Sequence, residues 1–415
     1  MNHLFFRIFL FVCALMVQNF SSQNYPDGLS DGTLEIDGKA VPVKIFATTS
    51  PQDFVDFSTK PLQGNTLVFL NDYVNEYANT NVFNNYRDNG FQLLNADFLP
   101  VSSGESVEQF KYFYKPLQPE NGITTAVQKV ALKTPFFIWN PSKGISLGGF
   151  TLHFYSLMFV LAFGLGYLIM AHIFKIDNVH QKFLDPLFTW TLVGTILGAR
   201  LGHVVFYQPE LFKQDFWSVF LPIQTVPEFK FTGFSGLASH GATIALIFTT
   251  LYYSFKIIKK NPFWVYDRIG IVVALGGAFV RLGNFFNSEI IGKPVAADSP
   301  FAILFPQMSS EYGITVPRYP TQLFEAAGYF LLFVLLWSLY RYTRRKYQQG
   351  WLFGLFFVVL WSIRLVVEFF KEPQGDEFIS FAGLNTGQIL SIPFIIAGLV
   401  IMFYSKRFQI AEKEQ

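Results

Sequence analysis

The chain has 415 residues, of which 51% are hydrophobic and 14% are charged, against roughly 25% charged residues in an average soluble protein. This balance excludes a disordered chain, argues against an ordinary soluble enzyme and indicates a membrane protein. The formal net charge is only +2, so no overall basic field attracts nucleic acid.

Cysteine and histidine usage excludes several kinds of site. The single cysteine, Cys13, lies in the extreme N-terminal segment, which argues against a disulfide framework, a thiolate metal site and a cysteine nucleophile in the mature chain. The six histidines include no HExxH pair, so a zinc protease has no support. We expect no metal site and no organic cofactor.

Residues 1–22 have the features of a secretory signal peptide. Arg7 precedes an apolar run from Ile8 to Val17, which is too short to span a bilayer. Small residues at Ser21 and Ser22 could end the signal. The alternative is an uncleaved anchor, and under either interpretation the next segment is exported.

Residues 23–140 are predicted to form an exported N-terminal domain. They contain 13 acidic and 8 basic residues, a net charge of −5, and no long apolar run. The segments 33–36 and 39–46 flank Asp37-Gly38, which predicts a hairpin because both central positions need a positive φ. Segments 66–70, 72–89 and 91–98 are predicted as strand, helix and strand. We expect a small α+β or β-rich domain of unknown role, without a catalytic motif.

Residues 141–415 are predicted to form a transmembrane domain of seven helices. Apolar segments of about twenty residues, the length that crosses ~30 Å of hydrocarbon, occupy 150–174, 185–207, 237–258, 264–286, 321–340, 351–370 and 385–404. One set of connections holds 12 basic residues and the opposite set holds 5. The positive-inside rule then places the N-terminus outside and the C-terminus inside, in agreement with an exported N-terminal domain.

With this topology, most of the unusual polar residues gather at the outer ends of the helices. A charge within the bilayer costs ~2.5–3.5 kcal/mol on insertion scales and usually serves a function. The outer residues are Tyr155, Arg200, His240, Arg281, Asn284, Glu289, Arg318, Gln322, Glu325, Arg364 and Glu368. Asp267 and Arg268 are the exception, at the inner end of their helix.

The chemistry implied by this cluster is recognition of an anion near the lipid headgroups. Arginine's planar fork matches phosphate oxygens, and the glutamates could hold the arginines in place. An arginine at a helix end can equally be a snorkelling anchor, and this alternative stays open for Arg318. His240 lies between the small residues Ser239 and Gly241, where a reactant could approach, so catalytic and structural roles both stay open.

Several stretches resemble the prolipoprotein diacylglyceryl transferase family. The longest, VRLGNFFNSEIIG from Val280 to Gly292, is similar to the family's GRxGNFxNxExxG signature. Five shorter stretches are similar to further family motifs in order and spacing: LHFY at 152–155, GAR at 198–200, SHGA at 239–242, YPTQLFE at 319–325 and RLVVEFF at 364–370. The resemblance covers about residues 135–410, so residues 23–134 lie outside it.

The resemblance implies a function and a set of site residues. The family is bacterial, lies in the inner membrane with seven spans, and transfers the diacylglyceryl group of phosphatidylglycerol to the lipobox cysteine of a prolipoprotein. It implies catalytic roles for His240, Arg364 and Tyr155. It also implies that phosphatidylglycerol is bound by Arg281, Asn284, Glu289, Gly292, Arg200, Gln322 and Glu368.

The sequence departs from the family pattern at four places. The residue before the signature arginine is Val280 instead of glycine, and HGG becomes HGA. Tyr319 replaces a histidine, so no histidine role carries over there. The family commonly has an implicated tyrosine one turn before Arg364, where this chain has Leu360. A hydroxyl at that spot is either dispensable or supplied from elsewhere, with Tyr155 and Tyr207 as candidates.

For the mechanism, we expect the cysteine thiolate to attack the glycerol carbon that bears the phosphate. Arg281 and Arg364 would stabilise the leaving phosphate, and His240 would be the general base. Alternatively, the arginines alone lower the thiol pKa and His240 only positions lipid. The competing functions are a multispan transporter or channel for an anionic solute or lipid, and an assembly factor whose exported domain holds partners.

Overall fold

The computed structural model describes thirteen stretches of the chain: residues 30–47, 64–69, 84, 86–101, 111–127, 129–142, 144–147, 150–221, 223–226, 228–231, 239–308, 316–372 and 384–405. The predicted signal peptide and Cys13 lie outside the described residues. The chain divides into two compact units. The first comprises Met1–Phe154, Asn284–Phe324 and Phe369–Asp376, and the second comprises Tyr155–Gly283, Glu325–Glu368 and Glu377–Gln415.

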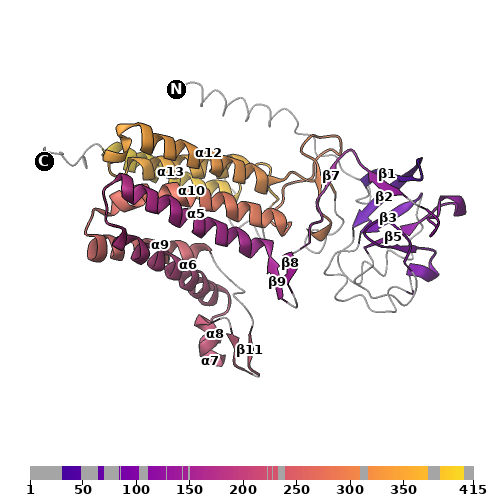
Figure 1. Ribbon diagram of the computed structural model, residues 1–415, viewed down its shortest axis with the longest axis horizontal. Coiled ribbons are helices and arrows are strands. Elements are labelled where there is room, and N and C mark those ends of the chain that lie inside the picture. Colours follow the sequence, from indigo (N-terminus) through magenta and orange to yellow (C-terminus); the bar gives the residue numbers. More distant parts are fainter. Residues whose placement is uncertain are drawn as a thin grey trace. The chain divides into compact units, whose positions relative to one another are not determined.

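The N-terminal part of the first unit is a six-stranded sheet with the strand order β4-β5-β3-β2-β1-β6. Its strands are β1 (Ser30–Ile36), β2 (Lys39–Ala47), β3 (Thr66–Phe69), β4 (Gln92–Leu94), β5 (Tyr112–Lys115) and β6 (Val130–Lys133). Strands β2 and β3 pair in parallel, and the other neighbours are antiparallel. The β-rich form of the predicted domain is therefore observed (Figure 1).

The predicted hairpin at Asp37-Gly38 is confirmed. Strands β1 and β2 pair with Ile36 opposite Lys39, and the two turn residues have φ values of +45° and +79°. Glycine tolerates this backbone at no steric cost and aspartate better than most residues. Of the next predicted elements, 66–69 is a strand as expected, but 91–98 is a strand only at 92–94 because a turn follows. Most of the predicted helix at 72–89 lies outside the described residues.

Both faces of this sheet are apolar, as the two-residue period of a strand allows. In β3, Leu67 and Phe69 enter one apolar core, while Val68 points to the other face and is equally buried. On that other face, the ring of Tyr86 stacks on Phe113 with the centroids 4.0 Å apart. Apolar side chains are therefore buried on both faces of the sheet.

The first core also includes residues that lie far along the chain. Val295, Ala302 and Leu304 are buried in the same apolar cluster as the sheet residues. Strand β7 (Phe137–Ile138) pairs in parallel with β12 (Ile303–Leu304). The hairpin of β8 (Gly144–Leu147) and β9 (Phe150–His153) completes the unit before the first long helix. The N-terminal sheet and the segment Asn284–Phe324 thus belong to one compact unit.

The second unit is helical, and its long helices run side by side in Figure 1. They are α5 (Phe154–Ile176), α6 (Leu184–Tyr207), α9 (Ser239–Tyr252, continued as a π-helix to Ile258), α10 (Pro262–Phe286), α12 (Thr321–Tyr342), α13 (Trp351–Val367) and α14 (Thr386–Tyr404). Within the described residues, five of these segments are long and apolar enough to cross a membrane. A 23-residue helix such as α5 is about 34 Å long.

Each of the seven predicted apolar segments contains a helix. The two that do not qualify as spans by length and composition are α6 and α13. Helix α13 has only 17 residues, and α6, which has 24 residues, is not apolar enough to qualify. The coarse prediction of a helical membrane region is therefore confirmed for five spans.

Small residues bring α6 and α9 into close contact. A Cβ atom on Gly241 would lie 2.1 Å from the carbonyl oxygen of Gly198, and one on Gly198 would lie 2.3 Å from Ala245 Cβ. Because no larger side chain fits, the two helix backbones touch directly at this level. This contact sets the position of the first turn of α9, which begins at Ser239.

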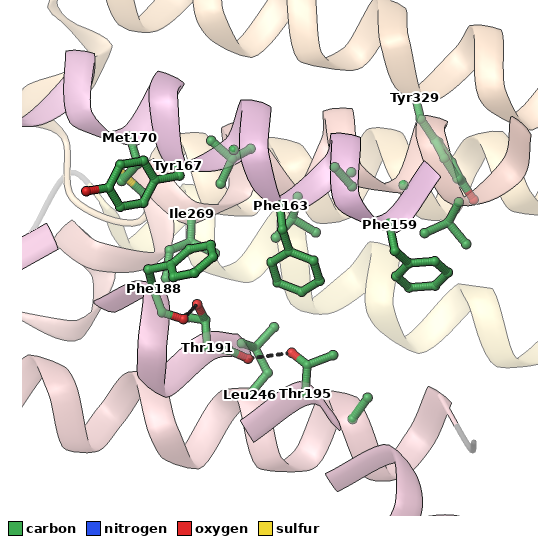
Figure 2. Close-up of a pocket in the computed structure, with 18 of the residues that line it drawn as sticks. Phe159, Phe163, Tyr167, Met170, Phe188, Thr191, Thr195, Leu246, Ile269 and Tyr329 are labelled. Atoms are coloured by element: carbon green, nitrogen blue, oxygen red, sulfur yellow. Dashed lines mark hydrogen bonds between the residues drawn. The ribbon is translucent and has the colours of Figure 1, made fainter. Parts of the chain in front are cut away.

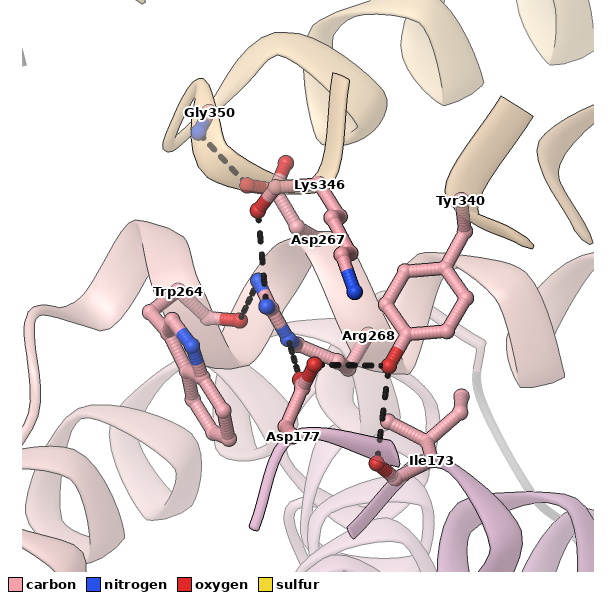
Figure 3. Close-up of polar contacts among 8 residues, drawn as sticks. All are labelled: Ile173, Asp177, Trp264, Asp267, Arg268, Tyr340, Lys346 and Gly350. Atoms are coloured by element: carbon pink, nitrogen blue, oxygen red, sulfur yellow. Dashed lines mark hydrogen bonds and ion pairs between the residues drawn. The ribbon is translucent and has the colours of Figure 1, made fainter. Parts of the chain in front are cut away.

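Asp267 and Arg268, which the sequence analysis set apart from the other polar residues, form a buried polar network (Figure 3). Arg268 Nε lies 2.8 Å from Asp177 Oδ2, and Tyr340 donates a hydrogen bond of 2.8 Å to the same carboxylate. Asp267 accepts the backbone N–H groups of Gly350 and Phe353, both at 2.8 Å. These contacts join α5, α10, α12 and the start of α13, so the two charges brace helices.

Candidate active site

The centre of the candidate site is an ion pair between α10 and α12. Arg281 Nε lies 2.6 Å from Glu325 Oε2, and the Glu325 side chain is only 1% exposed. Arg281 also makes a side-chain hydrogen bond to Tyr329, which lies one turn after Glu325 on α12. The carboxylate and the phenol, spaced i and i+4, share one helix face and hold the guanidinium between them.

A second arginine lies beside this pair. Arg364 is in the last turn of α13, where the helix dipole favours a cation, and its guanidinium carbon lies 5.1 Å from the centroid of the Trp361 ring. Arg364 Nε is buried and has no hydrogen-bond partner among the described residues. An unsatisfied buried donor costs ~1–3 kcal/mol or more when charged, so this atom is suited to an acceptor that a ligand supplies.

Both arginines line one cavity of about 460 Å³ in the second unit. Figure 2 shows a part of its lining that includes Phe163, Ile269 and Tyr329. Its walls come from α5, α6, α9, α10, α12 and α13, and Arg281 and Arg364 are the only charged residues among the described ones that line it. Along α10 the lining runs from Ile269 to Arg281, a rise of about 18 Å.

The walls of the cavity are apolar even where the side chains carry hydroxyls. Thr191 and Thr195 on α6 turn their hydroxyls back to backbone carbonyls of their own helix, at 2.8 Å and 2.7 Å, as the dashed lines in Figure 2 show. Phe159, Phe163 and Phe188 supply rings to the wall. The cavity therefore combines a long apolar chamber with two guanidinium groups.

Tyr155 lies at the start of α5 and packs on α10. A Cβ atom on Gly283 would lie 2.9 Å from Tyr155 Cδ2, so the glycine two residues after Arg281 leaves room for the ring. Tyr155 also interacts electrostatically with Arg281. The structure thus brings together Tyr155, Arg281 and Arg364 of the predicted residues.

Other predicted residues are placed less completely. His240 lies in the first turn of α9, but its side chain lies outside the described part of the structure, as does the Tyr207 side chain. The carboxylate of Glu368 lies beside Gly387, and Gly387 is in the first turn of α14. A helix N-terminus favours an anion at such a position.

Arg200 is directed to a loop between α6 and α9. Its Nε and Nη2 donate to the Ser218 carbonyl at 3.2 Å and 2.6 Å. Asp215 orders the same loop by accepting hydrogen bonds from Ser218, Thr225 and Val226. The Ser218 and Thr225 hydrogen bonds hold the pKa of Asp215 well below its usual range. Arg200 therefore anchors this loop.

Within the first unit, Asn284 and Glu289 form a compact polar turn. Asn284 Nδ2 donates to Glu289 Oε1 at 2.9 Å, and the Glu289 backbone N–H returns to the Asn284 carbonyl at 3.0 Å. Gln322 donates from Nε2 to the Glu289 carbonyl at 2.7 Å, while its Oε1 is buried without a hydrogen-bond partner among the described residues. These three predicted residues lie together.

Gly292 allows three backbone segments to meet. A Cβ atom there would lie 2.6 Å from the Tyr319 carbonyl oxygen and 2.8 Å from that of Phe370, so no side chain fits. The Gly292 carbonyl accepts a hydrogen bond of 3.1 Å from Arg318 Nη1, which also pairs with Glu372 at 2.6 Å. Arg318 is 6% exposed, which makes it a buried brace and not a snorkelling anchor.

Tyr329 is the site residue that the sequence analysis missed. It lines the cavity together with Leu360, Arg281 and Arg364 and is 4% exposed. The available signal was its position four residues after Glu325, on the same face of an apolar helix. Among the described residues, no group of three or more His, Cys, Asp or Glu side chains is arranged to hold a metal ion.

Comparisons with known proteins identify the family of this chain. Residues 143–404 match the family model described as prolipoprotein diacylglyceryl transferase. A phosphatidylglycerol–prolipoprotein diacylglyceryl transferase of Bacteroides fragilis is 38% identical over 269 residues, covering 64% of this chain and 94% of the relative. The enzyme of the same name from Tolumonas auensis is 38% identical over 63% of this chain and 95% of its own length. That of Helicobacter pylori is 30% identical, covering 68% and 99%.

The fold and the site define a helical multispan membrane protein with an arginine pair on an apolar cavity. The chain belongs to the prolipoprotein diacylglyceryl transferase family, because the family model covers more than half of it.

Proposed function

We propose that this protein transfers the diacylglyceryl group of phosphatidylglycerol to the cysteine thiol of a prolipoprotein lipobox. The observation that carries the proposal is the joining of an apolar cavity of about 460 Å³ to a buried cluster of Arg281, Glu325 and Arg364. The two relatives with 38% identity are matched over nearly their whole length, and their names support the same activity.

The charge of the cluster suits a phosphodiester. Glu325 offsets the charge of Arg281, and Arg364 adds one further positive charge beside the cavity. A buried net charge is costly unless it is paired. The phosphodiester of phosphatidylglycerol carries one negative charge, and its acyl chains suit the apolar walls. A free inorganic anion would use the arginines but leave the chamber without an apolar partner.

In the reaction, the cysteine thiolate forms a bond to the glycerol carbon that bears the phosphate. The bond from that carbon to the phosphate oxygen breaks, and glycerol phosphate leaves with the electron pair. The guanidinium groups of Arg281 and Arg364 stabilise the charge that develops on the leaving oxygen. The products are a thioether-linked lipid on the peptide and a soluble phosphate ester.

His240 accepts the thiol proton in this proposal, because neutral imidazole has a pKa near neutrality. Tyr155 and Tyr329 orient Arg281, and Tyr329 supplies a hydroxyl to the cavity that Leu360 also lines. The alternative assigns thiol activation to the arginines and lipid positioning to His240. If His240→Gln keeps near-normal turnover with an unchanged pH profile, the general-base role is wrong.

The remaining predicted residues have supporting roles in the proposal. Asn284, Glu289 and Gln322 shape the headgroup site through their shared turn, and Gly292 permits the close packing behind it. Glu368 supports the first turn of α14 near Gly387. Arg200 contributes by fixing the loop at Ser218.

The finer topology is also part of the proposal. We infer seven membrane spans in the bacterial inner membrane, with α6 and α13 added to the five segments that qualify by length and composition. The positive-inside distribution places the N-terminal domain in the periplasm. In this proposal residues 1–22 are a cleaved signal peptide. Residues 23–140 form the exported domain, and residues 141–415 form the transferase domain.

One measurement tests the function. Purified full-length protein is incubated with phosphatidylglycerol and a lipobox peptide, and the peptide is then weighed by mass spectrometry. The transferase adds a diacylglyceryl mass to the peptide and releases glycerol phosphate in equal amount. A peptide of unchanged mass, together with movement of lipid or anion across proteoliposomes, would instead identify a transporter.

A further inference from the structure

A short strap of the chain, residues 136–141, connects the N-terminal sheet to the polar turn that follows α10. Phe136 is buried in the apolar core of the sheet. Phe137 and Trp139 then donate backbone hydrogen bonds to the Ala302 and Leu304 carbonyls, at 3.1 Å and 2.9 Å. Gln307 donates to both the Asn140 side chain and the Pro141 carbonyl, at 3.1 Å and 2.6 Å. The strap is therefore fixed along its length.

The side chain of Trp139 contacts the end of α10. Its indole Nε1 donates a hydrogen bond of 2.8 Å to the carbonyl of Phe285, and its ring stacks on the Phe285 ring with centroids 4.3 Å apart. Phe285 lies in the last turn of α10, where the backbone carbonyls lack helical partners. Trp139 thus caps this helix end from outside the helix.

The turn that Trp139 caps is conformationally demanding. Ser288 and Ile290 have φ values of +56° and +61°, in the left-handed region that residues with a Cβ rarely adopt. The Phe285 carbonyl accepts both the indole N–H and the Ser288 backbone N–H, the latter at 3.0 Å. Such a backbone persists when its surroundings restrain it, and the indole is one of these restraints.

The same turn carries Asn284 and Glu289, whose mutual hydrogen bonds were described above. Asn284 directly precedes the capped residue Phe285, and Glu289 follows four residues later. A shift of the Phe285 carbonyl would therefore change the distance between the Asn284 amide and the Glu289 carboxylate. Trp139 lies before residue 143, where the match to the family model begins.

We propose that Trp139 is a positioning residue that holds the Asn284–Glu289 turn in the geometry that binds the lipid headgroup. The strap at 136–141, which directly follows the N-terminal sheet, thereby contributes to the positioning of this turn. This inference rests on the proposed function, in which Asn284 and Glu289 shape the headgroup site.

Two substitutions in the full-length protein separate the contributions of Trp139. Trp139→Phe keeps an aromatic ring for stacking but removes the N–H donor, whereas Trp139→Ala removes both. The matched control is Trp190→Phe, the same substitution at a partly exposed position of α6. Three quantities are measured: phosphatidylglycerol binding, the KM and kcat of transfer, and amide hydrogen exchange of the peptide 284–292.

We expect Trp139→Phe to raise the KM for phosphatidylglycerol about fivefold, as the loss of one hydrogen bond to a neutral carbonyl predicts, with kcat within about twofold. The Ser288 and Glu289 amides should exchange faster, because they donate to the Phe285 and Asn284 carbonyls. Trp139→Ala should raise the KM and the amide exchange rates further. Trp190→Phe should match the wild type in both quantities.

The outcomes distinguish this inference from the proposed function. If the wild type transfers lipid and Trp139→Phe has unchanged binding and KM, the positioning role is overturned, whatever the exchange rates show. If the wild type binds phosphatidylglycerol without transferring it, the proposed function fails, while weaker binding by Trp139→Phe would still support the positioning role. A wild type that neither binds nor transfers overturns both.

Discussion

Arg281 on α10 and Glu325 on α12 form an ion pair in which Nε and Oε2 are 2.6 Å apart. Glu325 is 1% exposed, so the pair is largely removed from solvent and the cost of burying either charge alone is high. The carboxylate engages Nε, and the Tyr329 side chain also hydrogen-bonds with Arg281. This geometry underlies the first prediction.

Arg281→Lys should reduce transfer by about 100-fold, the usual effect of removing one donor to a developing oxyanion. Lysine keeps the charge, but its compact ammonium group cannot serve Glu325 and a phosphate as a planar fork does. Arg281→Ala should abolish activity. The measurement is kcat/KM for phosphatidylglycerol, with Arg341→Lys at the exposed end of α12 as the control. Wild-type activity of Arg281→Ala would contradict a phosphate role.

Tyr329→Phe should lower kcat/KM about tenfold, because a hydrogen bond to a charged group contributes ~1.5–3 kcal/mol. The ring and its packing on Gly277 stay the same, so protein folding should not change. Tyr342→Phe, on the same helix but 80% exposed, provides the matched control. Equal kinetics for the two variants would show that the Tyr329 hydroxyl does not orient Arg281.

Gly276→Leu should restrict the lipid chains that the protein accepts. Gly276 lines the cavity, and a Cβ atom there makes an ordinary contact with Ala162 at 3.8 Å, so the added side chain should occupy empty volume. We expect transfer from long-chain phosphatidylglycerol to fall while a dihexanoyl substrate is still used. Gly164→Leu, where a Cβ meets nothing within 4 Å, is the control. Equal losses for both lipids would argue against an acyl-chain cavity.

Arg268→Ala should destabilise the helical unit without touching the cavity. It leaves the buried Asp177 carboxylate without its ion-pair partner, which costs ~3–5 kcal/mol and should lower the apparent melting temperature by on the order of 6 to 20 °C. Tyr340→Phe should cost ~1.5–3 kcal/mol, because it removes a hydrogen bond to the Asp177 carboxylate. The double variant Asp177→Leu with Arg268→Met should regain most of the loss. Thermal unfolding in detergent measures the stability of all three variants. An Arg268→Ala variant with the wild-type melting temperature would exclude a bracing role for Arg268.

Asp215 should make the loop between α6 and α9 sensitive to acid. Hydrogen bonds from Ser218 and Thr225 hold its pKa below the usual range, against about 3.9 in an unfolded chain. The stabilisation is therefore complete above about pH 3.9 and is lost as the pH falls through the folded-state value. Asp215→Asn should raise amide exchange in 211–226 at neutral pH and remove this acid dependence. An identical acid profile in the variant would refute the assignment.

Much of the site was predictable because its residues lie in short, distinctive stretches. Arg281, Asn284 and Glu289 follow one another along α10 and its end, and hydropathy alone places them at a helix terminus. The hairpin at Asp37-Gly38 was equally local, since two positive φ values are a property of those two residues.

Other features depend on contacts between distant segments. Nothing in the neighbourhood of Arg200 indicates that it donates to the Ser218 carbonyl, and nothing near Trp139 indicates Phe285 as its partner. From the sequence, Asp267 stood apart as an exception, and only the structure shows that the backbone N–H groups of Gly350 and Phe353 donate to it.

The sequence by itself determined that this chain is a membrane protein with arginines near helix ends and a family signature, because hydrophobic length, charge placement and motif spacing are local properties. Only the tertiary structure decided which arginines line the cavity, that Tyr329 joins them, and that the N-terminal sheet folds with the segment after α10. Those relationships arise from packing and hydrogen bonding between residues far apart in the chain, such as Asn140 and Gln307 at 167 positions, and no local pattern specifies such partners.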